Sequence, residues 1–281
     1  MLKIFKGLKK YAFIRDSYFF FRNLLDEMRF SSTISLKPDG LMINIGSGGF
    51  VCRNWTNLDF ISDLFYNAHK GVNFIPFDIR SDSIPFADAT VFCAYCSHVI
   101  EHIEEKHIEE LFKEVFRVLK PNGIFRLSFP DADFLYAVTL EDHNFWHWRK
   151  EWFDTEIKAM NGMEGTPSPV DFLVREIATP RCNFYRYAQN PIDKRNLEQK
   201  IKSLTKDEFL DYLVDGLEFR AEYPNDHISW WNYDKCKKFL IKAGFKRIFS
   251  SKYRGSVTPY MCSKEFDRTR PNMSCYIEAI K

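Results

Sequence analysis

The sequence predicts an α/β fold built on a mainly parallel sheet, with a helical insertion and a return to the sheet at the end of the chain. Two observations carry this prediction. Between residues 41 and 130, short apolar runs alternate with helical patterns, which is typical of strands joined by crossover helices. The pattern then fades and resumes at Tyr233, so we expect the far end of the chain to complete the same sheet.

The elements of the sheet follow in order along the chain. Five buried strands are expected over 41–45, 55–59, 72–77, 91–96 and 123–130. A helix is expected over 103–120, because its apolar side chains share one face and a Pro-Asn-Gly sequence ends it. After the insertion, we expect a helix ending at Ala243 with Gly244 as its cap, then strands over 246–251 and 274–280. Sheets of this kind bind ligands at the carboxyl ends of their strands.

The insertion is expected to be mainly helical and to span 132–225, with helical pieces near 143–160 and 195–215. The sheet domain then comprises 41–131 and 226–281, and residues 1–40 form an N-terminal helical segment. Two interpretations of the aromatic residues in the insertion stay open, the core of a helical lid or a pocket that stacks on a sugar or a base. These residues are Phe145, Trp146, Trp148, Trp152 and Phe153.

Composition excludes several classes of protein. The 281 residues are 45% hydrophobic and include 28 Phe, so the chain can bury a large core, which excludes low-complexity disorder and a minimal disulfide scaffold. Forty basic and 38 acidic residues leave a net charge of +2, too balanced for a surface built to bind nucleic acid. Seven scattered cysteines indicate reduced thiols and a cytoplasmic protein.

Residues 1–22 combine basic and apolar side chains in an order typical of an amphipathic helix. Arg15, Asp16 and Arg22 interrupt any apolar run of membrane-spanning length, and no small-residue cleavage site follows. Such a helix either packs on the edge of the domain with a solvated basic face or contacts the inner face of the membrane. Both interpretations stay open.

The strongest local signal is a glycine turn followed by an acid. The turn, GSGG at 46–49, follows the first strand, and Asp59 closes the second. Glycines are needed where a strand turns sharply and a ligand approaches the backbone. An acid at the end of the second strand can accept both hydroxyls of a ribose. Val51 stands where a dinucleotide fingerprint has its third glycine, which disfavours NAD.

Seven segments agree with one family in order and spacing. Together they resemble the class I S-adenosylmethionine-dependent methyltransferases, specifically the methyltransferase type 11-like group. Fainter matches at 226–245 and 270–281 are similar to methyltransferases of bacterial cell-surface sugar pathways. The seven segments are INIGSGG (43–49), WTNLD (55–59), FIPFDI (74–79), IPFADAT (84–90), SHVIEHI (97–103), LFKEVFRVLKPNGIFRLSFPD (111–131) and AGF (243–245).

The resemblance implies a Rossmann-like doubly wound sheet of seven strands, the last antiparallel, and S-adenosyl-L-methionine as the cofactor. The sequence departs from the family at Asn44, because the family usually has Asp or Glu at this position. An amide still forms hydrogen bonds but loses the charge attraction for the ammonium of the cofactor. The residues that the resemblance implies for cofactor binding are Asn44, Gly46, Ser47, Gly48 and Gly49 around the methionine part, Asp59 at the ribose, Asp78 and Ile79 beside the adenine, and Ser97 beneath the sulfonium.

Methyl transfer needs alignment of the reactants and removal of a proton from the acceptor, so a general base is expected. His98, at the end of the fourth strand, is the preferred candidate, followed by His227, where the insertion returns to the sheet. Asp131 is the third, and its alternative role is the cap of the next helix. His98 and His102 also match a zinc-protease pattern, but His98 follows a strand and no third ligand is signalled, so no metal is expected.

These signals indicate an S-adenosylmethionine-dependent methyltransferase that methylates an oxygen of a small-molecule or glycan acceptor, such as a sugar or a nucleotide-linked sugar. Two alternatives stay open. One is N- or C-methylation of another small metabolite. The other is a methyltransferase-like scaffold subunit that binds little cofactor, because Asn44 replaces the expected acid. No nucleic-acid partner is expected.

Overall fold

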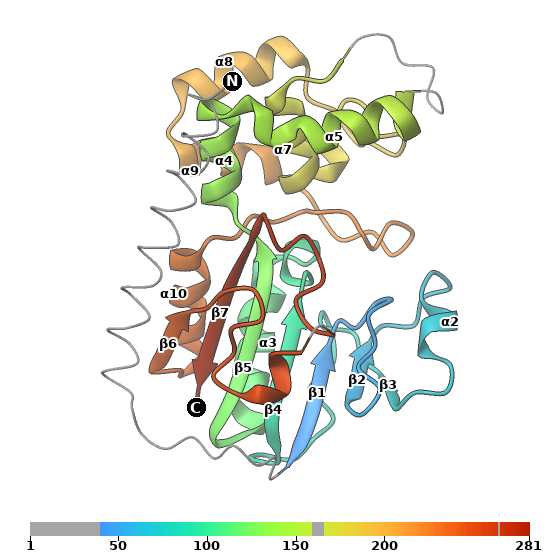
Figure 1. Cartoon of the computed structure of the whole chain (residues 1–281), viewed down its shortest axis with the longest axis vertical. Coiled ribbons are helices and arrows are strands. Elements are labelled where there is room, and N and C mark those ends of the chain that lie inside the picture. Colours follow the sequence, from blue (N-terminus) through green and yellow to red (C-terminus); the bar gives the residue numbers. More distant parts are fainter. Residues whose placement is uncertain (1–39, 159–165, 264) are drawn as a thin grey trace. The chain divides into compact units, whose positions relative to one another are not determined.

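The computed structural model describes residues 40–158, 166–263 and 265–281, which fall into two compact units (Figure 1). The sheet unit comprises residues 40–129 and 231–281. The helical unit comprises residues 130–158 and 166–230. The chain therefore leaves the sheet unit once, builds the helical unit, and returns.

A seven-stranded sheet organises the sheet unit (Figure 1). The order across the sheet is β3-β2-β1-β4-β5-β7-β6; the neighbours among β1 to β5 pair parallel, and β6 pairs antiparallel with β7. This order confirms the predicted doubly wound fold with its last strands antiparallel. The strands are β1 (Leu41–Ile45), β2 (Thr56–Asp59), β3 (Phe74–Pro76), β4 (Val91–Ser97), β5 (Leu119–Pro130), β6 (Arg247–Ser250) and β7 (Ser274–Ile280).

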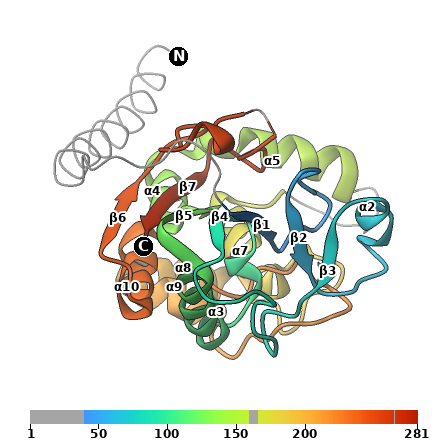
Figure 2. The same cartoon turned by 90° about the horizontal axis from the view of Figure 1, so that it is seen from below.

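Two helices lie together on one side of the sheet (Figure 2). They are α3 (Glu105–Val118) and α10 (Tyr233–Ala243). Gly244 ends α10 in the left-handed region at φ +112°, as its place after the helix predicted. A Cβ at this position would lie 3.0 Å from the ring of Phe116, so glycine also lets the two helices approach closely.

The expected alternation of strands and helices is wrong at the start of the sheet. No helix lies between β1 and β2 or between β3 and β4, and only the four-residue α2 (Tyr66–His69) lies between β2 and β3. The connection from β1 to β2 is residues 46–55, too short for a helical crossover, which takes about a dozen residues or more. The apolar face that a helix would bury there must be covered by another part of the chain.

The connection between β6 and β7, residues 251–273, covers this face, and we call it the covering segment (Figure 2). It includes the short turn η5 (Pro259–Met261). Phe266 packs its ring 5.2 Å from that of Trp55 and 5.0 Å from that of Tyr95, within a buried cluster that also contains Met261. Residues from the end of the chain thus complete the core beside β1 and β4.

Arg126 on β5 anchors the covering segment. Its guanidinium is fully buried and forms ion pairs with Asp267 at 2.6 Å and with Glu278 at 2.9 Å. It also donates to the hydroxyl of Ser251 and to the carbonyl of Lys252, each at 2.9 Å. With the bond from Nε to Asp267, all five guanidinium hydrogens have acceptors, which is what a buried charge requires.

The helical unit is built from short helices around an aromatic core. Trp146 and Phe153 are buried, and the rings of Trp146, Phe172 and Phe184 pack on one another, so these aromatic residues belong to the core of the unit. Helices were expected near 143–160 and 195–215; α4 and α7 are additional. The elements are α4 (Ala132–Glu141), η2 (His143–Trp146), α5 (His147–Trp152), η3 (Phe153–Ile157), α7 (Pro169–Ile177), η4 (Thr179–Arg181), α8 (Lys194–Ser203) and α9 (Lys206–Val214).

All seven cysteines are free thiols, as predicted. Cys93 and Cys96 lie on β4 and are both buried. Burial raises the pKa of the Cys93 thiol to about 12 and that of Cys96 further, so both stay protonated and pack as small apolar groups.

The N-terminal helical segment expected over 1–40 lies outside the described residues, apart from Gly40. The amphipathic helix expected over 1–22 lies outside them entirely. Within the described part of the chain, no helix combines the length and the apolar character that crossing a membrane requires.

Candidate functional site

The chain turns sharply at the carboxyl end of β1. Gly46 and Gly48 have φ values of +64° and +48°, in the left-handed region that favours glycine. A Cβ at position 46 would lie 2.4 Å from the side chain of Val99, so glycine allows the loop after β4 to approach the turn. A Cβ at Gly49 would meet nothing within 4 Å, so the backbone of the turn is open on that side.

Asp59 faces this turn from the end of β2. Its Oδ2 accepts a hydrogen bond from the backbone N–H of Gly48 at 2.5 Å, and its Oδ1 accepts one from the N–H of Phe60 at 2.8 Å. Burial raises the pKa of the Asp59 carboxyl, and the two N–H donors oppose that shift. A carboxylate has about four acceptor positions, so Asp59 keeps capacity to accept hydroxyl donors such as those of a ribose.

A histidine that the sequence did not indicate also reaches the turn. The Oγ of Ser47 lies 3.2 Å from Nε2 of His69, at the end of α2. The ring of His69 stacks on Phe74 of β3, with their centres 4.1 Å apart. Ser47 and His69 are 22 positions apart in the chain, and only the pairing of β1, β2 and β3 brings them together.

Asn44 is buried in β1, with 2% of its surface exposed. Its Nδ2 donates to the carbonyl of Phe50 and to Oδ1 of Asn57, each at 3.0 Å. Both amide hydrogens are therefore used inside the protein. The Asn44 amide can offer a ligand only its carbonyl oxygen.

The residues predicted to flank an adenine follow β3. The N–H of Phe77 donates to the carbonyl of Asp59 at 2.8 Å, which places Asp78 and Ile79 beside the end of β2. Asp78 pairs with Arg80 at 2.6 Å, and the hydrogen bond from Arg80 lowers the pKa of the Asp78 carboxyl. The carboxylate of Asp78 thus forms hydrogen bonds within its own turn. Asp78 and Ile79 both remain partly exposed.

His98 follows β4 and has an unusual backbone, with φ at +53°. Nδ1 of its ring lies 3.0 Å from Oε1 of Glu101, and Nε2 lies 2.8 Å from Oγ of Ser274. Because the Ser274 hydroxyl donates to the carbonyl of Arg270, it accepts from Nε2–H of His98. Both ring nitrogens are engaged, so His98 can act as a base only after one of these contacts opens.

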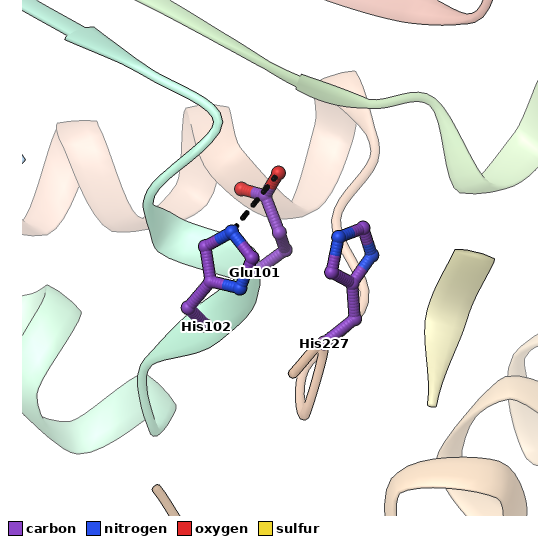
Figure 3. Close-up of side chains that lie close together, drawn as sticks. All are labelled: Glu101, His102 and His227. Atoms are coloured by element: carbon purple, nitrogen blue, oxygen red, sulfur yellow. Dashed lines mark ion pairs between the residues drawn. The ribbon is translucent and has the colours of Figure 1, made fainter. Parts of the chain in front are cut away.

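The next turn, η1 (Ile100–His102), carries a carboxylate between two imidazoles. Oε1 of Glu101 lies 3.0 Å from Nδ1 of His98 and 4.0 Å from Nε2 of His102. Figure 3 shows the ring of His102 facing the Glu101 carboxylate; His227, also labelled there, belongs to the helical unit and is described with it. The histidine-glutamate motif thus forms a local network at the carboxyl end of β4.

Ser97, the last residue of β4, lies beside β5. Its Oγ is 2.7 Å from Oγ of Ser128, so the two hydroxyls form a hydrogen bond across neighbouring strands. Ser128 also accepts, through its carbonyl, the backbone N–H of His98 at 2.8 Å. These bonds fix the conformation of the chain where it leaves β4.

The other two base candidates, His227 and Asp131, belong to the helical unit. Nδ1 of His227 donates to the carbonyl of Glu176 at 2.6 Å, so Nε2 is the basic nitrogen of the neutral ring. The carboxylate of Asp131 accepts the N–H of Phe134 at 3.2 Å and caps α4, which is the alternative role expected for it.

Part of the chain is similar to a known domain family. Residues 51–127, from just after the glycine turn to β5, match the family model described as a methyltransferase domain. No curated protein matches the chain. The strand order of the sheet agrees with the family match.

Several solved structures are similar to the chain. One is a SAM-dependent methyltransferase from Archaeoglobus fulgidus, with 12% identity, a TM-score of 0.44, and coverage of 96% of this chain and 100% of that one. Another is a methyltransferase of the same kind from Mesorhizobium loti, with 16% identity, a TM-score of 0.39, and coverage of 88% and 94%. Human N-acetylserotonin methyltransferase, crystallised with SAM, shows 12% identity, a TM-score of 0.40, and coverage of 86% and 47%. The strand order, and not these likenesses, establishes the fold.

Proposed function

We propose that this chain is an S-adenosylmethionine-dependent methyltransferase that methylates a hydroxyl oxygen of a small acceptor, a sugar or a nucleotide-linked sugar. One observation carries the cofactor half of this proposal: the buried carboxylate of Asp59 lies against an open glycine turn, 2.5 Å from the N–H of Gly48. The family match to a methyltransferase domain supports it.

The residues at the turn fit this cofactor. The open side of Gly49 gives an amino-acid moiety access to the backbone, and Asp59 offers acceptor positions to a ribose. Asn44 supplies no charge for an ammonium group, because its amide is neutral. Recognition of the amino-acid part therefore depends on the shape of the turn more than on attraction between charges.

When bound, the cofactor supplies a methyl group activated by its sulfonium. The oxygen of the acceptor forms the new bond to the methyl carbon while the bond to sulfur breaks, and the acceptor loses its hydroxyl proton. His98 is our candidate for the base in the sheet unit. It can take the proton at Nε2 only after that nitrogen has lost its own hydrogen and separated from Ser274 Oγ, which leaves its lone pair free.

The choice of a sugar acceptor rests on the resemblance of residues 226–245 and 270–281 to methyltransferases of cell-surface sugar pathways. Oxygen is the acceptor atom that most needs a base, because a neutral hydroxyl is a poor nucleophile.

Calorimetric titration with S-adenosylhomocysteine tests the cofactor half. We expect the native chain to bind and Asp59→Ala to bind at least about tenfold more weakly, a loss of about 1.4 kcal/mol. Asp63→Ala is the matched control, because Asp63 is an exposed acid on the same loop, and its affinity should equal that of the native chain. Failure of the native chain to bind would refute the cofactor half and favour the scaffold alternative.

An acceptor screen with methyl-labelled cofactor tests the other half. Sugars and nucleotide-linked sugars are compared with amines and with carbon acceptors of similar size. Label in a methyl ether supports the proposal. Label on nitrogen or carbon would keep the methyltransferase and overturn the acceptor class.

A further inference from the structure

The loop that forms the glycine turn is held from behind by a fully buried asparagine, Asn57 of β2. Its Oδ1 accepts the N–H of Cys52 at 2.8 Å and Nδ2–H of Asn44 at 3.0 Å. Its Nδ2 donates to the carbonyls of Cys52 at 3.0 Å, Trp55 at 3.3 Å and Asn73 at 3.1 Å. One side chain therefore satisfies several backbone groups of the connection between β1 and β2.

These contacts fix which way both amides point. The N–H of Cys52 can only donate, so the atom of Asn57 that faces it must be the oxygen. Asn44 must then present its NH₂ group to that oxygen and to the carbonyl of Phe50. Neither amide can rotate by half a turn without losing hydrogen bonds, so Asn44 and Asn57 form one unit, which we call the amide pair.

The amide pair supplies hydrogen-bond partners to the backbone that a helical crossover would otherwise provide. In a helical crossover, the backbone groups after the turn bond to one another. Residues 46–55 form no helix, and a buried backbone group left without a hydrogen-bond partner is destabilising. Asn57 supplies those partners, and Asn44 ties the loop to β1 through Phe50.

The amide pair also accounts for the neutral residue at position 44, where the family usually has an acid. A carboxylate there would face two acceptors, Oδ1 of Asn57 and the carbonyl of Phe50, with no hydrogen to offer either. In this chain an acid at position 44 would push the turn away from its present shape. Position 44 therefore carries an amide and not an acid because Asn57 needs a hydrogen-bond donor there.

We propose that Asn57 is a positioning residue of the cofactor site, which together with Asn44 shapes residues 46–55 for S-adenosylmethionine. Asn57 is fully buried, so it acts through the loop and not by touching the cofactor. The inference rests on the proposed function, because cofactor affinity is its main readout.

The decisive variant is Asn44→Asp, tested by calorimetry with S-adenosylhomocysteine. Simple attraction for the ammonium group predicts tighter binding, whereas the amide pair predicts binding at least about tenfold weaker. The matched control is Asn67→Asp, which adds the same charge on exposed α2, where Asn67 accepts only from Lys70. Its affinity should stay within about twofold of the native value. Binding by Asn44→Asp as tight as native, or tighter, overturns the proposal.

A double-mutant cycle tests whether the two amides act together. Asn44→Ala and Asn57→Ala are compared singly and combined, and the combined loss of affinity should be smaller than the sum of the single losses. Losses that simply add would contradict the pair. If Asn57→Ala does not fold, Asn57→Asp replaces it; it keeps the two acceptor contacts and places a carboxylate against the carbonyls of Cys52, Trp55 and Asn73.

Hydrogen exchange at the backbone amide of Cys52 separates this inference from the proposed function. That N–H bonds to Asn57, so its protection should fall in Asn57→Ala and Asn44→Asp and stay native in Asn67→Asp, with or without ligand. If the native chain binds no cofactor, the proposed function fails, and the exchange result alone decides whether the amide pair holds the loop. Unchanged protection refutes it.

Discussion

Among the residues that the structure describes, each unit buries one arginine, and the two arginines are stabilised in different ways. Arg126 of the sheet unit is enclosed by hydrogen-bond acceptors, with two carboxylates, a hydroxyl and a carbonyl around its five hydrogens. Arg149 of the helical unit pairs with the carboxylate of Glu176 at 2.5 Å. Its guanidinium also lies over the rings of Trp148 and Trp152, at 4.3 and 4.8 Å.

The difference shows what each charge does in its unit. The partners of Arg126 lie more than a hundred positions away in the chain, so this arginine joins the covering segment to the sheet. Arg149 joins two neighbouring helices, α5 and α7, and its aromatic neighbours shield it from water. Loss of Arg126 should therefore lower the affinity for the cofactor, and loss of Arg149 should not.

The largest effect is expected for Arg126→Met. It leaves Asp267 and Glu278 buried without their cation, which costs about 3–5 kcal/mol or more, close to the whole stability of many domains. Urea unfolding gives the loss. Arg268 of the covering segment lies 4.9 Å over the ring of Phe50, next to the glycine turn. Because the variant would loosen this contact, its affinity for S-adenosylhomocysteine should fall. Lys113→Met, which breaks only exposed pairs, should leave both unchanged.

Arg149→Met is expected to cost less, about 3 kcal/mol, because one buried carboxylate and not two loses its cation. Unfolding in urea measures the loss, and cofactor affinity should stay native while the protein is folded. Lys150→Met is the neighbouring control, since its pair with Asp154 is exposed. A loss of cofactor affinity in Arg149→Met as large as that in Arg126→Met would contradict the proposed difference between the two arginines.

The pH dependence of stability sharpens the comparison further. Burial opposes ionisation of Glu176, but the charges of Arg149 and Arg175 outweigh it, so the pKa of Glu176 lies below its ordinary value. Its contribution to stability is present above the unfolded pKa of about 4.3 and is lost as the pH falls through the folded pKa. Arg149→Met removes the largest of the charges that lower this pKa, so the pKa of Glu176 rises and its contribution to stability becomes smaller. The gap in unfolding free energy between native and variant should narrow from pH 7 to pH 4; a constant gap would contradict this account.

The smallest effect concerns Asp131. Asp131→Ala should cost about 1 kcal/mol, because it removes the cap of α4. Asp131→Asn should keep that stability, since asparagine caps a helix as well as aspartate does. Methyl-transfer rates then separate the two roles: a rate that follows stability indicates a cap, and a rate lost in Asp131→Asn indicates a base.

The sheet was predictable because its strands are short apolar runs bounded by turns, and the strand order confirms that prediction. The crossover helices at its start were predicted wrongly, since a local pattern cannot show that residues 251–273 cover the same face. In the helical unit, α7 went unnoticed because its first residue, Pro169, belongs to a part of the sequence rich in glycine and proline, which is typical of loops.

Within the candidate site, the local signals were the glycines and Asp59; Gly48 and Asp59 are 11 positions apart and are found in contact. His69, Asn57 and Ser274 carry no local signal. Ser274 reaches His98 across 176 positions of the chain, and only the order of the strands determines that meeting. Partners set by topology lie beyond what spacing along a sequence can predict.

The covering segment has a consequence for synthesis of the protein on the ribosome. The apolar face beside Trp55, Phe92 and Tyr95 is made before the helical unit, but the residues that bury it, Met261 and Phe266, are made after that unit. A growing chain must therefore hold this face uncovered while the entire helical unit is translated. Contacts so distant in sequence also slow folding. The nascent chain therefore exposes this apolar face until the covering segment emerges.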